Sequence, residues 1–328
     1  MPSAHEVARL AGVSQAAVSR AFTPGASIAE ATRVKVLDAA KELGYYPNLL
    51  ARSLTTGDTG IIGVIIGNPR NTFNLAALHA LSERVSRADR HLLVFTSHPD
   101  MDPDHLLEAL LRFRVASLLV MAPSMPGDLA YRCQEKGICV AFFNHRAGMG
   151  ATFPSVTGAN YDGAGVIAEH MLAQGYRRLA VITGDENSSS VREREVGFVA
   201  RVVSLGLPIP AKVIGGFGRN TMPAARELLS MSPRPDAIFC THDILAMATI
   251  DTARYEFGLE IGREIGIAGF NNIAGAAQMT YNLTTYSQPV DEMIERVTEI
   301  ILNPQDFPDD CHVIVEGELI ARASTQRG

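Results

Sequence analysis

Most of the chain, from residue 61 onward, alternates short apolar runs with longer amphipathic stretches. Uninterrupted apolar strands separated by helices predict parallel sheets that helices cover on both faces. Residues 61–328 are too many for one core of this kind, so the sequence predicts two α/β lobes. The expected strands are 61–66, 92–96, 117–121, 139–143, 179–183, 212–214, 237–240 and 265–268. The expected helices include 74–88, 162–174, 194–205, 244–257 and 291–302.

The first 46 residues follow another pattern, that of a small helical domain. The segment 6–20 (EVARLAGVSQAAVSR) indicates two short helices joined by a tight turn. Ser3 and Glu6 fit a capping box for the first helix, because each side chain can pair with the other's backbone N–H. Gly12 should end that helix, since glycine tolerates the positive φ of a sharp exit. The expected apolar side is Val7, Ala8, Leu10 and Ala11.

The second helix has an outer face suited to DNA. Ser14 is a good N-cap, because its hydroxyl can accept an otherwise unpaired backbone N–H. At about 100° per residue, the apolar side consists of Ala17, Val18, Ala21 and Phe22. The opposite side is small and polar and consists of Gln15, Ala16, Ser19 and Arg20. Such a face fits the recognition helix of a helix-turn-helix motif, which lies in the major groove. The alternative is an ordinary helical hairpin whose outer face meets only water.

A third helix is expected over residues 30–43, where Gly44 marks the end. Its apolar residues at three-residue spacing are Val34, Leu37, Ala40 and Leu43. We therefore expect a helix-turn-helix domain over residues 1–46, a hinge helix and linker over 47–60 and a core over 61–328.

The expected hinge helix is short. Asn48 can cap it, and Leu50 and Leu54 lie one turn apart on one side. A helix of this length is unstable alone in water, so it would form only against a partner. That makes it a candidate switch between two domains, with a plain linker as the alternative.

Composition limits the classes of function. The net charge is −6, and residues 1–60 carry six basic against five acidic side chains, which leaves +1 there and −7 in the remainder. Contact with DNA phosphates should therefore be confined to the N-terminal end. No apolar run reaches the roughly 20 residues that span a bilayer, and the N-terminus lacks a secretory signal. We expect a cytoplasmic protein. The four cysteines lack metal-binding spacing, so neither a metal nor a cofactor is expected.

Three segments in this order, VARLAGVSQAAVSRAF, TRVKVLDAAKELGYYPNLLARSL and IIGVII, resemble the lactose-repressor/galactose-repressor (LacI/GalR) family of bacterial transcription regulators. The resemblance continues to about residue 325. It implies an all-α helix-turn-helix headpiece on a periplasmic-binding-protein-like core of two Rossmann-like lobes around a ligand cleft. The N-terminal lobe would comprise about 61–158 and 290–320, and the C-terminal lobe about 161–287. The chain would cross between them near 158–161, 287–290 and 318–322.

The resemblance also implies the partners. A palindromic operator in double-stranded DNA requires two heads related by a two-fold axis, and hence a homodimer. No leucine-heptad tail precedes Gly328, so we expect a dimer rather than a tetramer. No membrane partner is expected, and DNA-bound molecules would lie on the nucleoid.

Side-chain chemistry and the resemblance together indicate which residues would contact DNA. Arg20 is the strongest candidate for reading a base, because arginine can bond O6 and N7 of guanine together. Leu54 matches the family's hinge leucine, which wedges into the minor groove and kinks the duplex. The hinge would then fold only when docked on DNA. The other candidates for base, phosphate or capping contacts are Ser3, Ser14, Gln15, Ala16, Ser19, Asn48, Leu50 and Arg52.

Family matching places ten residues on the walls of the ligand cleft: Phe73, Asn74, Asn144, His145, Ser190, Arg192, Arg194, Phe217, His242 and Asn271. Arg194, three residues before Gly197, matches the family's ligand-gripping arginine. The chain departs from the family at two positions, because His242 replaces the usual asparagine and Asn271 stands where aspartate is common.

These departures bear on the effector, which we expect to be a small carbohydrate-like molecule such as a sugar, a sugar acid or a sugar phosphate. An anionic effector is favoured by the absent carboxylate at Asn271 and by the donors or positive charges of His145, Arg146, Arg192 and His242. Glu193 and Glu195 would weaken it if they face inward. A neutral sugar held by hydrogen bonds is an equal alternative.

The sequence thus favours a ligand-responsive transcriptional repressor, whose cleft changes the docking geometry of the hinge. The alternative is a solute-binding protein of a sugar transporter, which would carry a secretory signal and no DNA-binding head. An enzyme is disfavoured, because the chain contains no GxSxG, P-loop or HExxH motif and no GxGxxG between a strand and a helix.

Overall fold

The computed structural model describes residues 2–23, 25–46, 59–67, 71–97, 102–122, 127–148, 151–216 and 221–327. The chain forms two compact units, Met1–Gly60 and Ile61–Gly328. In the part of the chain that is described, no helix is long and apolar enough to cross a membrane.

In its described residues, the first unit is a head of three helices, α1 (Ala4–Ala11), α2 (Gln15–Ala21) and α3 (Glu30–Leu43). Ser3 and Glu6 form the predicted capping box, and Gly12 ends α1 with φ of 66°. The Ser14 hydroxyl accepts a hydrogen bond from the backbone N–H of Ala17 at 3.2 Å. The caps predicted for the first two helices are therefore confirmed, and they fix the sharp turn between them.

The predicted apolar faces of α1 and α3 are partly wrong. The core of the head consists of Val7, Ala8, Val18, Ala21, Val36, Ala39 and Ala40, whereas Leu10, Val34 and Leu37 are exposed. A step of three residues turns a helix by about 300°, so three such steps carry the chain to the opposite side. Val34 and Leu43 therefore cannot share a face. The buried residues of α3 follow the three-then-one spacing of 36, 39 and 40 instead.

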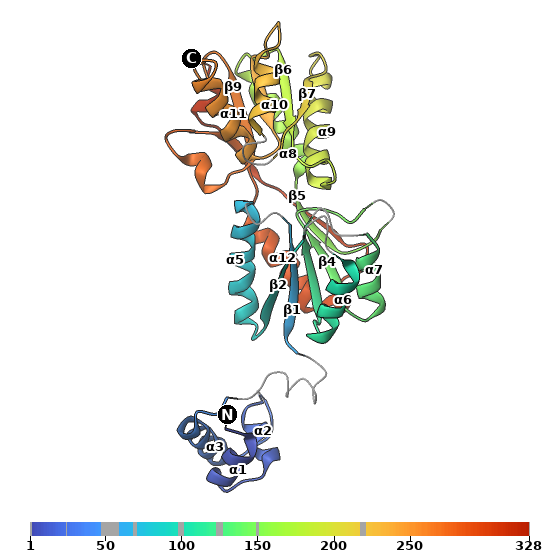
Figure 1. Ribbon diagram of the computed structural model, residues 1–328, viewed down its shortest axis with the longest axis vertical. Helices are drawn as coiled ribbons and strands as arrows, with labels where there is room; N and C mark the ends of the chain where they lie inside the picture. The colour runs from blue at the N-terminus through green and yellow to red at the C-terminus, as the bar shows by residue number, and fades with distance from the viewer. Residues whose placement is uncertain are drawn as a thin grey trace. The chain divides into compact units, whose positions relative to one another are not determined.

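The second unit contains two six-stranded sheets, and the first defines the N-terminal lobe (Figure 1). Its strand order is β11-β5-β4-β3-β1-β2, and every pair of neighbours is parallel. The strands are β1 (Ile61–Ile66), β2 (His91–Thr96), β3 (Ser117–Met121), β4 (Cys139–Phe143), β5 (Ser155–Gly158) and β11 (His312–Val315). One face packs on α5 (Thr72–Arg87) and α12 (Val290–Leu302) and the other on α6 (Pro103–Arg112) and α7 (Gly127–Glu135).

The second sheet defines the C-terminal lobe and repeats this topology, with the order β12-β10-β9-β8-β6-β7. Its strands are β6 (Leu179–Thr183), β7 (Ala211–Ile214), β8 (Ala237–Cys240), β9 (Gly266–Asn271), β10 (Thr284–Ser287) and β12 (Glu318–Ile320). Only β12 among them is antiparallel to its neighbour. Helices α8 (Asn160–Ala173) and α9 (Ser189–Ser204) cover one face, and α10 (Thr221–Leu229) and α11 (Asp243–Tyr255) cover the other. Short 3-10 turns occur at Ala274–Ala277, Pro304–Asp306 and Ala323–Thr325.

The eight predicted strands are present, with ends shifted by at most a few residues. Four further strands, β5, β10, β11 and β12, were not predicted. Their sequences, SVTG, TTYS, HVIV and ELI, are short, and each includes at least one polar residue. Short segments of this kind lack the continuous apolar run that marks a strand buried on both faces.

The unpredicted strands carry the crossings between lobes. The chain leaves the first sheet after β5, returns after β10 and leaves again after β11. This last crossing lies between Val315 and Glu318, not at 318–322, because β12 already pairs with β10 in the second sheet. The expected N-terminal lobe of 290–320 therefore extends too far, and the expected C-terminal lobe lacks the last ten described residues.

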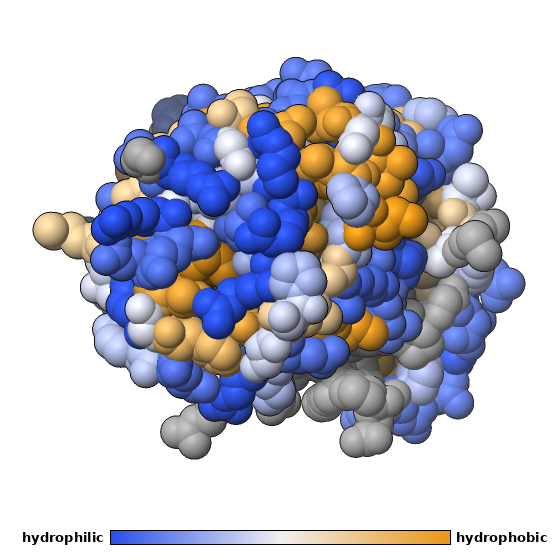
Figure 2. Space-filling view, turned by 90° about the horizontal axis from the view of Figure 1, so that it is seen from above, coloured by the Kyte–Doolittle hydropathy of each residue, from blue (hydrophilic) through white to orange (hydrophobic). Residues whose placement is uncertain are grey.

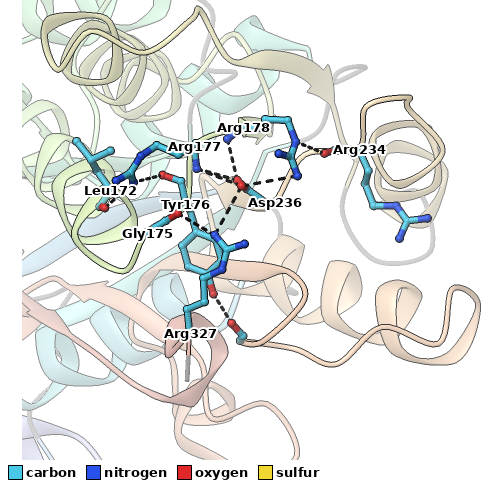
Figure 3. A network of polar contacts seen from close by, with 9 residues as sticks. Leu172, Gly175, Tyr176, Arg177, Arg178, Arg234, Asp236 and Arg327 are labelled. Carbon is cyan, nitrogen blue, oxygen red and sulfur yellow. Dashed lines mark hydrogen bonds and ion pairs between the residues drawn. The ribbon is translucent and has the colours of Figure 1, made fainter.

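Arg327, near the end of the chain, contacts the C-terminal lobe at Asp236 (Figure 3). This buried carboxylate accepts hydrogen bonds from the backbone N–H groups of Arg177 and Arg178 at 2.8 to 3.2 Å. The guanidinium of Arg327 lies 3.7 Å from it, over the ring of Tyr176, and donates to the carbonyl oxygen of Gly175. A buried carboxylate needs such donors, so these contacts hold the C-terminal segment in place.

Candidate functional site

The outer face of α2 presents the predicted DNA-reading surface. Gln15, Ala16, Ser19 and Arg20 are all exposed, while Val18 and Ala21 are buried on the opposite side. The Nε of Arg20 donates to the carbonyl oxygen of Ala16 at 3.3 Å, an exposed bond that DNA can replace. The face can therefore offer a guanidinium, an amide and small side chains to a groove.

The predicted serines have other partners in the head. The Ser3 hydroxyl is engaged with Glu6 in the capping box, and the Ser14 hydroxyl caps α2. Their capping role is thus structural, and a phosphate contact would have to be shared with it. The hinge candidates Asn48, Leu50, Arg52 and Leu54 lie outside the described residues.

The carboxyl ends of the two sheets meet in the core. The backbone N–H of Arg146, which follows β4, donates to the hydroxyl of Ser189 at the start of α9 at 2.8 Å. This bond joins the N-terminal lobe to the C-terminal lobe. In open parallel sheets, ligands bind at this edge, where the loops after the strands converge.

Arg194 lies at the centre of this region. Its side chain is fully buried, its Nε donates to Asn160 Oδ1 at 2.8 Å, and its Nη1 donates to the carbonyl oxygen of Thr241 at 2.7 Å. The guanidinium stacks on the ring of Phe270 at 4.0 Å, and its Nη2 has no hydrogen-bond partner. Burial lowers the pKa of Arg194 to about 9, which still leaves it charged near neutral pH. One donor edge is therefore held ready for a ligand.

A buried aspartate supports the neighbouring turn. Asp243 accepts a hydrogen bond from the Thr285 hydroxyl at 2.6 Å and from the backbone N–H of Ile273 at 2.8 Å. Burial raises the pKa of Asp243 to about 6, against the opposing effect of these donors and of Arg194. The turn that it holds begins at Asn271, whose φ of 113° is unusual for a residue with a side chain. Gln288 Nε2 donates to Asn271 Oδ1 at 2.7 Å.

The two cleft histidines are neutral, not cationic. Burial lowers the pKa of His145 to about 4, although its Nδ1 lies 2.9 Å from the carbonyl oxygen of Phe143. Burial and the positive charge of Arg194 lower the pKa of His242 to about 3. The anionic hypothesis for the effector counted these two residues as donors or positive charges. Near neutral pH neither imidazole adds a positive charge, so each can contribute only as a hydrogen-bonding group.

The N-terminal lobe contributes a mainly apolar wall. Phe73 is buried and stacks on Phe143 with ring centroids 6.3 Å apart. The Asn74 amide donates weakly to the carbonyl oxygen of Met121 at 3.5 Å. Asn144 follows β4 in the left-handed region, with φ of 58°. Ser190, on the C-terminal lobe, pairs with the hydroxyl of Ser188 at 2.9 Å.

Among the described residues, five buried polar atoms without a hydrogen-bond partner lie at these edges: Asn144 Oδ1, His145 Nε2, Thr183 Oγ1, Arg194 Nη2 and Gln288 Oε1. Four of them belong to residues that end or follow a strand, and the fifth belongs to α9. Buried polar groups are nearly always paired, so a cluster of unpaired ones indicates a ligand site.

Sequence reasoning missed four contributors to this site, namely Asn160, Thr183, Phe270 and Gln288. Each is an ordinary residue of a strand end or crossing, with no motif of its own. A polar residue at the end of a predicted apolar strand was the one available signal, and Thr183 satisfies it, whereas Gln288 follows β10, which was not predicted.

Two predicted cleft residues are not brought to this region. Arg192 is exposed on the outer face of α9, and its Nη1 donates to the carbonyl oxygen of Glu186. It lies two positions before Arg194, which turns it by about 200° around the helix. Phe217 lies outside the described residues. Within the described ranges, no group of His, Cys, Asp and Glu side chains could hold a metal ion.

Comparisons with known proteins agree with both units. Residues 3–48 match the family described as bacterial regulatory proteins, lacI family, and residues 168–325 match the periplasmic binding protein-like domain. The ribose operon repressor of Escherichia coli (strain K12) is 30% identical over 307 residues, covering 92% of this chain and 93% of that protein. The repressor PurR of Photobacterium profundum is 29% identical over 306 residues, covering 92% and 91%.

Solved structures show the same fold. A crystal structure of the lac repressor dimer bound to operator and the anti-inducer ONPF superimposes with a TM-score of 0.87 and covers 99% of both chains at 22% identity. A complex of the transcriptional regulator CelR with cellobiose gives a TM-score of 0.75 at 21% identity, covering 99% of this chain. The chain has a helix-turn-helix head, a two-lobed core and a relative that is 30% identical over 92% of its length. It therefore belongs to the LacI family of bacterial transcription regulators, which join a DNA-binding head to an effector-binding domain.

Proposed function

We propose that this protein is a ligand-responsive transcriptional repressor that binds a palindromic operator as a homodimer. The observation that carries the proposal is that one chain contains both an exposed polar helix face and a buried site with an unpaired hydrogen-bond donor. The outer face of α2 offers Gln15 and Arg20 without covering them, and the core holds Arg194 with a buried, unpaired donor edge. One surface suits a DNA groove and the other suits a small ligand. Residues 47–60, between them, would form the hinge.

The chemistry of the core favours a neutral, hydroxyl-rich effector over an anion. Two of the unpaired atoms, Asn144 Oδ1 and Gln288 Oε1, are acceptors that require a donor from the ligand. A carboxylate or phosphate group cannot supply this donor, so the two acceptors require hydroxyls, which neutral sugars, sugar acids and sugar phosphates all carry. The preference between a neutral and an anionic sugar therefore rests on the charge of the site. Arg194 is the one cation in this cluster, because His145 and His242 are neutral and Arg192 faces outward.

The relatives point in the same direction. One is named for the ribose operon, and a structural neighbour is a complex with cellobiose. We infer that a monosaccharide or small oligosaccharide enters between the lobes, with its ring against Phe73 and its hydroxyls on Arg194, Asn144 and Asn271.

The test of this effector class is a calorimetric titration of the protein with matched sets of neutral sugars, the corresponding sugar acids and the sugar phosphates. Saturable binding of a neutral sugar, with Kd tighter than for its acid or phosphate, is expected. Tight binding of only the charged members would overturn the neutral assignment and restore the anionic one.

Exposed apolar side chains on both lobes support the homodimer. Val94, on the edge strand β2, and Leu111 and Phe113, at the end of α6, are each at least 40% exposed. On the C-terminal lobe, Tyr255 is 73% and Met279 is 97% exposed. The surface seen from the end of this lobe is mostly polar but interrupted by apolar patches (Figure 2). Apolar patches of this kind mark association sites, and the lac repressor structure is a dimer on operator.

The DNA-binding part of the proposal is tested by a fluorescence-anisotropy titration of the gene's promoter region with the wild type and Arg20→Ala. Loss of one bidentate base contact costs about 1–3 kcal/mol, so specific affinity should fall by roughly 5- to 150-fold while ligand binding is unchanged. Leu54→Ala should weaken operator binding without changing the thermal stability of the core. A stoichiometry of two chains per operator is expected. Unchanged DNA affinity in both variants would refute the mechanism.

A further inference from the structure

The outer face of α9 borders a cavity that is separate from the effector site. It measures about 520 Å³, which is within the range of small-molecule pockets. The lining residues that matter here are Arg146, Tyr161, Ser189, Arg192, Glu193 and Val196. Arg146 belongs to the N-terminal lobe and the others to the C-terminal lobe, so the cavity lies where the two lobes touch.

The geometry of α9 separates this cavity from Arg194. Ser189, Arg192, Glu193 and Val196 are spaced three and four residues apart, and therefore share one face of the helix. Arg194 projects from the other face and is fully buried. A single helix thus lines two different sites.

The floor of the cavity is apolar and exposed. The side chain of Tyr161 is 48% exposed and that of Val196 is 54% exposed. The ring of Tyr161 pairs with no other aromatic ring in the described part of the core, where other rings do pair. An exposed ring beside an aliphatic side chain is a surface that an apolar ligand body can cover.

The charges at the rim are unbalanced. Neither Arg146 nor Arg192 forms an ion pair with an acidic residue among those described, whereas Arg132 and Arg201 in the same core each do. Glu193 is the one acid in the lining, and its carboxylate accepts a hydrogen bond from Asn160 Nδ2 at 3.1 Å. Two cations against one anion leave a single positive charge, which suits a monoanion better than a dianion.

We propose that this cavity binds a small organic monoanion, a carboxylate attached to an aromatic or aliphatic body. The carboxylate accepts hydrogen bonds from Arg146 and Arg192, and the body covers Tyr161 and Val196. Such a ligand contacts both lobes beside the hydrogen bond from Arg146 N–H to Ser189 Oγ, and so favours the arrangement in which the lobes touch. Its contacts are separate from those of a ligand at Arg194, which projects from the other face of α9.

The chain contains no tryptophan, so an indole ligand is the only indole fluorophore in the sample. The test titrates the full-length protein into indole-3-acetate and follows the fluorescence anisotropy of the indole. Indole-3-acetamide is the neutral control of the same shape. Saturable binding of the acid, with the amide about tenfold weaker, is expected from the loss of a charge-assisted hydrogen bond.

Two neighbouring substitutions to glutamine should change the affinity in opposite directions. Arg192→Gln should weaken binding of indole-3-acetate about tenfold, as should Arg146→Gln. Glu193→Gln keeps an oxygen for Asn160 and removes the repulsive charge, so it should strengthen binding. Arg296→Gln, at an exposed arginine paired with Glu299 on α12, should leave binding unchanged.

A folding defect cannot produce both signs from adjacent positions on one helix. The proposal is overturned if indole-3-acetate shows no saturable binding at millimolar concentration, or if acid and amide bind equally. It is also overturned if Arg192→Gln and Glu193→Gln shift binding in the same direction.

Discussion

The two lobes of the core have the same strand order but bury different side chains. In the N-terminal lobe, the residues around β4 are mainly aromatic, with Phe73 and Phe143 stacked and Asn144 and His145 the nearest polar groups. In the C-terminal lobe, charged and amide groups are buried, among them Asn160, Arg194, Asp243 and Asn271. One lobe therefore offers an apolar cover, and the other a set of fixed hydrogen-bonding groups.

This difference shows that one strand topology can support either an apolar surface or a set of fixed hydrogen-bonding groups. Burying a polar group costs free energy unless the group is hydrogen-bonded. The C-terminal lobe therefore holds its buried polar side chains in place by hydrogen bonds within the protein, without a ligand. Asp243 fixes the turn at Ile273, and Asn160 fixes Arg194. The N-terminal lobe has little of this scaffold and offers mainly apolar side chains. The expected effects of substitutions differ accordingly.

The largest contrast should come from two glycines. A Cβ at Gly197 on α9 would collide with the backbone carbonyl oxygen of Tyr161 on α8, and backbone cannot rotate away. Gly197→Ala should lower the free energy of unfolding by about 3 kcal/mol or more. At Gly63 on β1 the nearest atoms are side-chain carbons of Leu118, Val115 and Leu110 at 3.0 to 3.2 Å, which can shift.

Gly63→Ala should therefore cost only about 1 kcal/mol. Urea denaturation of the two variants and the wild type measures the difference. Equal losses would show that the close packing of α8 on α9 is no tighter than the packing around β1.

The next contrast concerns ligand affinity. Arg194→Met removes the guanidinium and should raise the Kd of the effector about 100-fold, because two charge-assisted hydrogen bonds are lost. Phe73→Leu removes part of the apolar cover and should raise it less than about tenfold. Calorimetric titration with the best-binding sugar gives both values. A larger effect at Phe73 would reverse the roles assigned to the lobes.

The smallest contrast lies in the pH dependence of stability. The folded pKa values of His145 and His242 lie below the ordinary value of 6.5, at about 4 and 3. Each histidine therefore contributes stability that is full above pH 6.5 and is lost as the pH falls toward the folded pKa. His145→Asn and His242→Asn should each flatten the acid side of the stability curve, His242→Asn over the wider range.

Asp243 acts in the opposite direction, because its raised pKa of about 6 favours the folded state as the pH falls from 6 toward 4. Asp243 is present in both the histidine variants and the wild type, so its effect cancels in the difference between their free energies of unfolding. Part of the shift at His242 comes from the charge of Arg194. In an Arg194→Met background, the effect of His242→Asn should shrink while that of His145→Asn remains. Stability measured by urea denaturation at pH 3 to 7 checks both expectations.

Local chemistry in the sequence was enough for much of the fold. Ser3, Gly12 and Ser14 act within a few residues of themselves, so the ends of α1 and α2 follow from the sequence. The eight apolar strands could also be predicted, because a strand buried on both faces must be apolar throughout. The outer face of α2 follows from helical spacing alone, and hence so do Gln15 and Arg20 as candidates for DNA contact.

Other features depend on contacts between distant parts of the chain, which only the tertiary structure decides. The short strands β5, β10, β11 and β12 exist because neighbouring strands pair with them, not because their own residues demand it. The neutrality of His145 and His242 results from burial, and the outward direction of Arg192 results from which side of α9 packs on the sheet. The types of side chain in the sequence thus determined that hydrogen-bond donors line this core. Packing in the tertiary structure determined their charge and direction, because burial changes a pKa and a helix can bury only one face.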